Sequence, residues 1–141
     1  MHLRGFATVN IWADDVPAAV EWYAQVLGVE AYFQRPGPDG PPVYAEFRVG
    51  DFEAELGIID RRFAPAGASH APGGAIVYWH VDDLKATVDS LLSLGAEEFE
   101  PITPRGDLGF VTASVVDPFG NLLGVMYNPH YVEIAASTGR G

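Results

Sequence analysis

The chain has 141 residues, 48% of them hydrophobic, which suits one packed domain that buries roughly two-thirds of its unfolded surface. Its 19 acidic and 8 basic residues give a formal net charge of −11, which argues against nucleic acid as a partner because such binding relies on Lys and Arg. The lack of cysteine excludes disulfides and thiolate metal sites, and no apolar run suits a membrane helix or secretory signal, so we expect a cytoplasmic protein.

The first half of the chain predicts a strand, a helix and three more strands. The helix follows Asp15, whose carboxylate can cap exposed N–H groups, and it stops before Gly28, a residue type that favours helix ends. Gly50-Asp51 is typical of a hairpin turn between the last two strands. The predicted ranges are strand 6–12, helix 16–27, strand 29–34, a loop at 35–42, and strands 43–49 and 52–59.

The same order of elements recurs after residues 60–74, a connector rich in Ala, Pro and Gly. The final hairpin turn is Asp117-Pro118-Phe119-Gly120-Asn121, in which Asp117 can accept a backbone N–H and Gly120 can adopt a positive φ. The predicted ranges are strand 75–81, helix 84–94, strand 97–102, a loop at 103–107, strands 110–116 and 122–127, and a loose tail at 129–141.

These patterns form an internal repeat. Trp12-Ala13-Asp14-Asp15-Val16 aligns with His80-Val81-Asp82-Asp83-Leu84, and Leu27-Gly28 aligns with Leu94-Gly95. The repeat predicts an α+β fold with two tandem βαβββ modules that form a curled mixed sheet around a shared cavity. We expect one domain over 1–128, with module one at 5–60, the connector at 61–74 and module two at 75–128.

The repeated segments resemble the vicinal oxygen chelate superfamily, which includes glyoxalase I, extradiol dioxygenases, fosfomycin-resistance enzymes and bleomycin-resistance proteins. The matching residues are Asp15 with Val20-Glu21-Trp22-Tyr23 and Leu27-Gly28, then Val81-Asp82 with Leu94-Gly95-Ala96, and the turn from Asp117 to Asn121. The resemblance implies paired modules whose sheets curl around a pocket, and a homodimer.

The resemblance also implies four metal-ligand positions, which fall at Thr8, Glu55, Ile76 and Gly124. Members that use a metal usually carry His or Glu at such positions, and here only Glu55 offers a carboxylate. One carboxylate and a Thr hydroxyl do not hold a divalent ion, and Ile and Gly offer no side-chain donor. The resemblance is therefore to the branch that lacks the metal site, and we expect neither a metal nor another cofactor.

The alternation of each strand directs one set of side chains toward the predicted cavity. This set mixes polar and aromatic groups, as is usual for a small-molecule site. Its members are Thr8, Asn10, Trp12, Glu53, Glu55, Ile76, Tyr78, His80, Thr112, Ser114, Gly124 and Met126. Trp12 and Tyr78 could stack on a planar or cationic ligand, or they could pack between modules or across a dimer.

Two of these side chains are candidates for catalysis. Glu55 could act as a general base or anchor a ligand if burial raises its pKa, or it could be a solvated carboxylate. His80 could be an acid/base group or a displaced metal ligand, but we favour a satisfied histidine at a strand end. Arg105, in a predicted loop, could bind an anion or simply be solvated.

Three functions follow from these residues. The first hypothesis is a protein that binds a small organic molecule without a metal, for example to sequester a drug, with a cationic aromatic compound as the best match to the acidic charge. The second is a metal-independent lyase or isomerase with Glu55 or His80 as acid/base. The third is a metalloenzyme with relocated ligands such as Glu55 and His80.

Overall fold

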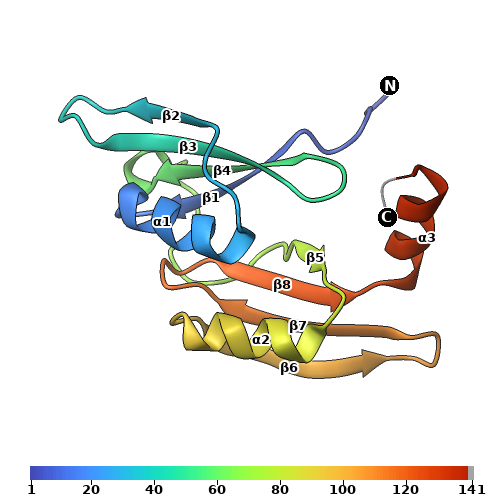
Figure 1. Ribbon diagram of the computed structural model, residues 1–141. Helices are drawn as coiled ribbons and strands as arrows, with labels where there is room; N and C mark the ends of the chain where they lie inside the picture. The colour runs from blue at the N-terminus through green and yellow to red at the C-terminus, as the bar shows by residue number, and fades with distance from the viewer. Residues whose placement is uncertain (140–141) are drawn as a thin grey trace. The chain divides into compact units, whose positions relative to one another are not determined.

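The computed structural model describes residues 1–139, and the chain forms two compact units, the first ending at Ala68 and the second beginning at Ser69. Each unit has a four-stranded mixed sheet with a helix along one face (Figure 1). No helix in the described part of the chain is long and apolar enough to cross a membrane. The predicted α+β class is confirmed.

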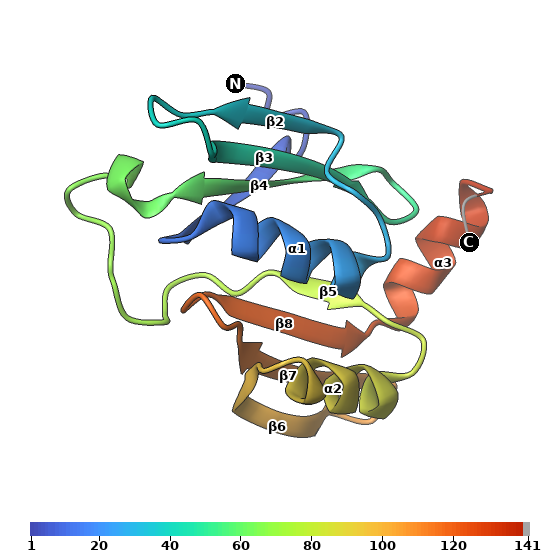
Figure 2. The same cartoon turned by 60° about the vertical axis from the view of Figure 1, so that its left-hand side comes forward.

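The first unit follows the predicted βαβββ order. Its sheet order is β1-β4-β3-β2, with β1 parallel to β4 and the remaining pairs antiparallel. The elements are β1 (Thr8–Ala13), α1 (Val16–Leu27), β2 (Phe33–Pro36), β3 (Pro42–Val49), β4 (Ala54–Asp60) and a short 3-10 helix, η1 (Arg61–Phe63). Figure 2 shows α1 lying along β3 and β4.

Helix α1 begins and ends as the sequence predicts. The Asp15 carboxylate accepts a hydrogen bond of 3.0 Å from the backbone N–H of Ala18, which satisfies an N-terminal donor of the helix. Gly28 follows the last turn with a φ of 69°, a left-handed conformation that glycine adopts without a steric penalty. The helix packs on β3 and β4, where Phe47 and Ile58 are fully buried.

The second unit repeats this architecture. Its sheet order, β5-β8-β7-β6, matches that of the first sheet strand for strand, and β5 is parallel to β8. This correspondence confirms the internal repeat. The elements are β5 (Tyr78–His80), α2 (Leu84–Ser93), β6 (Glu97–Arg105), β7 (Phe110–Val116), β8 (Leu122–Tyr127) and α3 (Pro129–Ser137).

The turn between β7 and β8 has the predicted structure. The Asp117 carboxylate accepts hydrogen bonds from the backbone N–H groups of Phe119, at 2.8 Å, and of Asn121, at 2.9 Å. Gly120 has a φ of 90°, which a residue with a side chain rarely adopts. The turn fixes the pairing of Val116 with Leu122, and both strands have the predicted bounds.

Five strand predictions are wrong at their ends by two residues or more. The strand predicted at 29–34 begins only at Phe33, because residues 28–32 connect it to the helix, and the strand predicted at 75–81 shortens to β5. Strand β1 begins at Thr8 and β4 at Ala54, both later than predicted. Conversely, β6 continues through the predicted loop at 103–107 as far as Arg105, which pairs with Phe110 across the hairpin.

The predicted loose tail is also wrong over residues 129–137, which form helix α3, and its last two residues, 140–141, lie outside the described range. The Asn128 side chain caps this helix by accepting hydrogen bonds from the N–H groups of His130, at 2.9 Å, and Tyr131, at 3.1 Å. The Tyr131 ring stacks on His80 at 4.8 Å, and Ala135 is buried. These tertiary contacts stabilise a helix too short to persist alone. The single domain over 1–128 and the shared cavity stay predictions.

Candidate functional site

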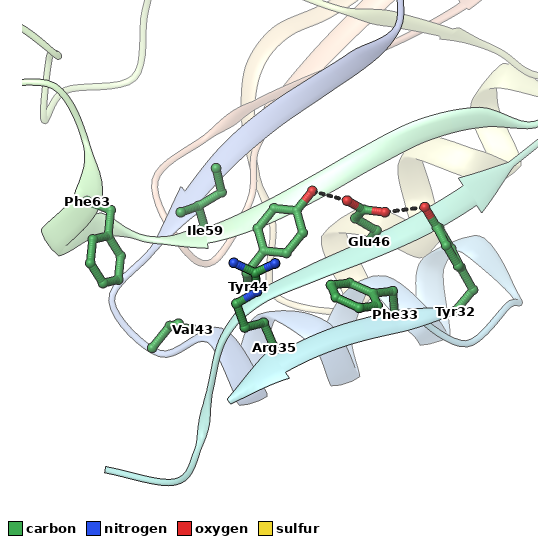
Figure 3. A pocket seen from close by; sticks show the side chains of 8 residues that line it. All are labelled: Tyr32, Phe33, Arg35, Val43, Tyr44, Glu46, Ile59 and Phe63. Carbon is green, nitrogen blue, oxygen red and sulfur yellow. Dashed lines mark hydrogen bonds between the residues drawn. The ribbon is translucent and has the colours of Figure 1, made fainter. Parts of the chain in front are cut away.

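A cavity in the first unit lies on the face of the sheet opposite α1. Alternation along β3 buries Ala45 and Phe47 beneath the helix and turns Tyr44 and Glu46 to the other face. The cavity has a volume of about 630 Å³ and is predominantly aromatic and aliphatic, with two charged groups. It is lined by Tyr32, Phe33, Arg35, Val43, Tyr44, Glu46, Ile59 and Phe63 (Figure 3).

Glu46 lies between two phenol groups in this pocket. Figure 3 shows one carboxylate oxygen accepting a hydrogen bond from the Tyr44 hydroxyl and the other accepting one from the Tyr32 hydroxyl. These bonds lower the pKa of Glu46, so the group is a carboxylate at neutral pH. The hydrogen bond to Glu46 raises the pKa of Tyr32, while burial and the same carboxylate raise the pKa of Tyr44, so both phenols keep their protons.

Backbone pairing holds these groups in place. The N–H of Tyr32 donates to the carbonyl of Glu46 at 3.0 Å, and Glu46 pairs with Gly57 of the neighbouring strand. Gly57 has no side chain, and the amide oxygen of Asn10 lies where its Cβ would be, with the Tyr44 ring also in contact. A larger residue at 57 would therefore displace the groups beside Glu46.

A second carboxylate, Glu55, lies next to this cluster. Its Oε2 is 3.1 Å from the Tyr32 hydroxyl and 4.0 Å from Nη2 of Arg48, the residue directly opposite it on β3. The Arg48 guanidinium lies 4.7 Å from the centre of the Tyr32 ring, and its Nη2 is 3.4 Å from the Tyr32 hydroxyl oxygen. Tyr32 thus joins both carboxylates and the guanidinium.

The other predicted residues of the first unit lie near this cluster but do not line the pocket. In the parallel ladder of β1 and β4, Thr8 is beside Glu55 and Trp12 is beside Ile59. Asn10 contacts the cluster through its amide, as described above. Glu53 is in the turn before β4, with a φ of 50°, so it does not belong to the alternating face of the strand.

In the second unit the predicted residues form no comparable cluster of charges. Met126 pairs with both His80 and Thr112 in the sheet ladders. The Thr112 hydroxyl accepts a hydrogen bond of 3.0 Å from Nε of Arg105, which also pairs with Glu100 at 3.1 Å. Arg105 is therefore a strand residue with partners and not a mobile loop cation.

The Gly124 backbone lies directly beneath other side chains. A Cβ added there would come within 2.7 Å of the Tyr78 ring, 2.8 Å of Ile76 Cγ2 and 2.9 Å of the Val77 carbonyl oxygen. Such contacts are too close for a side chain of any size. Gly124 pairs with Tyr78 just as Gly57 pairs with Asn10, so the two glycines occupy equivalent places in the repeat.

His80 is a structural residue at the end of β5. Its Nδ1 accepts a hydrogen bond of 3.1 Å from the backbone N–H of Asn128, and its Nε2 lies 3.3 Å from Asp82 Oδ1. The ring is also stacked on Tyr131 and in contact with Tyr127. Both ring nitrogens thus have partners, and the histidine joins β5 to the start of α3.

The residues at the four family ligand positions do not fit a divalent metal ion. Glu55 is the only carboxylate among them and is already in contact with Tyr32 and Arg48. Gly124 has no room for a carboxylate-bearing side chain, and Ile76 offers no donor. Within residues 1–139, no group of three or more His, Asp or Glu side chains could hold a metal ion.

The polar residues at the centre of this pocket are absent from the predicted set. Tyr44, Glu46 and Arg48 alternate with Ala45 and Phe47, and this period-two pattern predicts that the three polar side chains share one face. The cavity residues predicted for the first module lie only on its first and fourth strands and in the turn before the fourth, so its third strand was left out. Tyr32 has no comparable signal, because it precedes β2 in a connection whose path depends on tertiary structure.

Comparison with solved structures supports the fold. A lactoylglutathione lyase from Agrobacterium tumefaciens is 21% identical, with a TM-score of 0.66 over 92% of this chain and 98% of that chain. TioX from Micromonospora sp. ML1 is 20% identical, with a TM-score of 0.64 over 87% and 98%. A glyoxalase-related enzyme from Fulvimarina pelagi is 16% identical, with a TM-score of 0.69 over 90% of each chain.

Family membership follows from the sequence. No curated protein gives a significant sequence match. The sequence profile of the Glyoxalase/Bleomycin resistance protein/Dioxygenase superfamily, in contrast, matches residues 5–125, which include both repeated modules. The chain therefore belongs to the Glyoxalase/Bleomycin resistance protein/Dioxygenase superfamily.

Proposed function

We propose that this protein binds a small organic molecule, without a metal, in the pocket centred on Glu46. The observation that carries the proposal is an ionised carboxylate, fixed by two phenol groups, within a wall of aromatic side chains. Pockets of about this size, with a few oriented polar groups in an apolar wall, are typical small-molecule sites. Drug sequestration is one role that such binding would serve.

The chemistry of the wall favours a ligand with an aromatic or cationic group. Phe33 and Phe63 are 41% and 55% exposed, and the Arg62 guanidinium lies 5.3 Å from the centre of the Phe63 ring, a place that a ligand cation could take. The carboxylate of Glu46 would attract a positive group, and electron-rich rings attract cations over their faces. The formal charge of −11 adds a general attraction for cationic compounds.

Isothermal titration calorimetry with a panel of aromatic cations and matched neutral aromatics tests the proposal. Saturable binding, weakened about tenfold or more in Glu46→Gln, is the expected result, because the variant keeps the shape and removes the charge. Glu98→Gln, which changes an exposed carboxylate in the second unit, is the matched control. Flat titrations across the whole panel would contradict the proposal.

A metal-independent lyase or isomerase is a second candidate. The observation that favours it is the Tyr32 hydroxyl, which contacts the carboxylates of both Glu46 and Glu55 and could exchange protons with a substrate. This candidate predicts that Glu55→Gln abolishes turnover while ligand binding survives. Unchanged turnover in that variant would remove Glu55 from the mechanism, and His80 is less suited because both of its ring nitrogens have partners.

Metal independence and oligomeric state are also proposals. A relocated metal site that used His80 would have to break its contacts with Asn128 and Asp82, so we do not favour it. Elemental analysis of protein purified without a His tag checks this, and a stoichiometric metal would contradict metal independence. We further propose a homodimer in the cytoplasm, and sedimentation equilibrium would detect a monomer if the dimer does not form.

A further inference from the structure

A cation of the chain itself lies beside the proposed pocket. The Arg48 guanidinium lies over the Tyr32 ring, its Nη2 is 3.4 Å from the Tyr32 hydroxyl oxygen, and it is 4.0 Å from Glu55. Its side chain is nevertheless 53% exposed, so these contacts hold it only weakly. Arg48 therefore makes the contacts that a small organic cation would make on Tyr32, and it could move aside into solvent.

The hydrogen-bond donors and acceptors around Tyr32 indicate which kind of cation would bind there. The Tyr32 hydroxyl has one hydrogen, yet its oxygen is within hydrogen-bond distance of carboxylate oxygens of both Glu46 and Glu55. The carboxylates and phenol oxygens thus offer more acceptor sites than the two hydroxyl hydrogens can fill. The surplus calls for a group with several N–H donors, such as a guanidinium or amidinium.

We propose that the pocket selects planar organic cations that carry N–H donors, and that Arg48 competes with them for Tyr32 and Glu55. The inference rests on the proposed function of the pocket and adds its ligand class and a specificity-determining residue. A ligand cation that takes the place beside Tyr32 and Glu55 must displace the Arg48 guanidinium. Removing Arg48 therefore strengthens the binding of such cations instead of weakening it.

The test compares two probes in titration calorimetry with wild-type protein and Arg48→Gln. Benzamidinium has a planar group with N–H donors, whereas phenyltrimethylammonium has the same charge and ring but no N–H. We expect Arg48→Gln to tighten benzamidinium binding about two- to fivefold, the range of an exposed cation–π contact and ion pair, with a smaller gain for phenyltrimethylammonium. Arg4→Gln, which removes an exposed charge elsewhere in the first unit, should change neither affinity.

Each outcome separates this inference from the proposed function. Unchanged or weaker benzamidinium binding in Arg48→Gln would overturn the competition, and so would an equal gain for both probes, which indicates charge alone. If neither cation binds while a neutral aromatic compound does, the ligand class is wrong and the proposed function stands. If no probe of any class binds either protein, the proposed function fails as well.

Discussion

Glu46 is the residue on which the pocket depends, and its charge state links pH to stability. The hydrogen bonds from Tyr32 and Tyr44 lower its pKa in the folded protein below the ordinary value of a glutamate. A carboxyl with a lowered folded pKa stabilises the protein above its unfolded pKa, and this contribution is lost as the pH falls through the folded pKa. The contribution is therefore complete at neutral pH and disappears in acid.

Glu46→Gln tests this linkage. We expect the variant to lower the free energy of unfolding by about 1 kcal/mol at neutral pH, since charged hydrogen-bond partners are lost at a partly exposed site. The difference from wild type should shrink as the pH falls through the lowered pKa of Glu46. Urea denaturation over this pH range measures it, with Glu98→Gln as the control; a difference that does not change with pH would contradict the assigned charge state.

Gly124 is the residue with the least room in the second sheet. A methyl group there would meet Tyr78, Ile76 and the Val77 carbonyl at 2.7 to 2.9 Å. We expect Gly124→Ala to lower the free energy of unfolding by about 1–3 kcal/mol, the usual cost of overpacking. Gly67→Ala is the control, because an added Cβ at Gly67 meets nothing within 4 Å. Equal effects in chemical denaturation would contradict the close approach.

At the scale of elements, α3 depends on its N-cap residue, Asn128, and on one aromatic contact. Asn128 accepts two backbone N–H groups at the helix N-terminus, and an Ala there would leave them to water. We expect Asn128→Ala to cost about 1 kcal/mol of unfolding free energy. Ser137→Ala, at the C-terminal end of the same helix, should cost less in the same thermal unfolding experiment, and a neutral Asn128 variant would show that the cap is dispensable.

Some elements of the fold can be predicted from local sequence patterns and others cannot. The caps of α1 and α2 and the Asp117 turn are local, so their residues predict them directly. Helix α3 depends on a contact between distant residues, His80 with Tyr131, and the extension of β6 depends on pairing across its hairpin, Arg105 with Thr112. The local composition at residues 103–105 and 129–137 indicates polar loops, because it does not reveal which residues will contact these segments in the folded protein.

The candidate site likewise contains some residues that the sequence predicts and others that it does not. Alternation along β1 and β4 puts Thr8, Asn10 and Glu55 on one face, where Thr8 pairs with Glu55 and Asn10 pairs with Gly57. Alternation does not predict that Tyr32, which lies in the connection between α1 and β2, reaches Glu46. The position of Tyr32 depends on its backbone hydrogen bond to Glu46, which is distant in the sequence. The aromatic wall is therefore a property of the fold and not of any one motif.

For the whole molecule, the formal charge of −11 sets the response to salt. Acidic self-repulsion destabilises a compact chain, and ions at about 0.2 M screen it over distances beyond about 10 Å. We expect the melting temperature to rise when NaCl is increased from about 10 mM to about 200 mM. An uncharged osmolyte at equal osmolality is the control, and a melting temperature that falls with salt would indicate that ion pairs outweigh the repulsion.

The paired glycines have a consequence for how this protein could change. Asn10 lies over Gly57 and Tyr78 lies over Gly124, so each glycine and its covering side chain are complementary in size. A Glu introduced at 124 would clash with Tyr78, with Ile76 and with the backbone carbonyl of Val77, so a smaller residue at 78 would not by itself make room for it. A carboxylate ligand at this position therefore also requires a shift of the backbone at residue 77, which no single substitution would supply in evolution or in design.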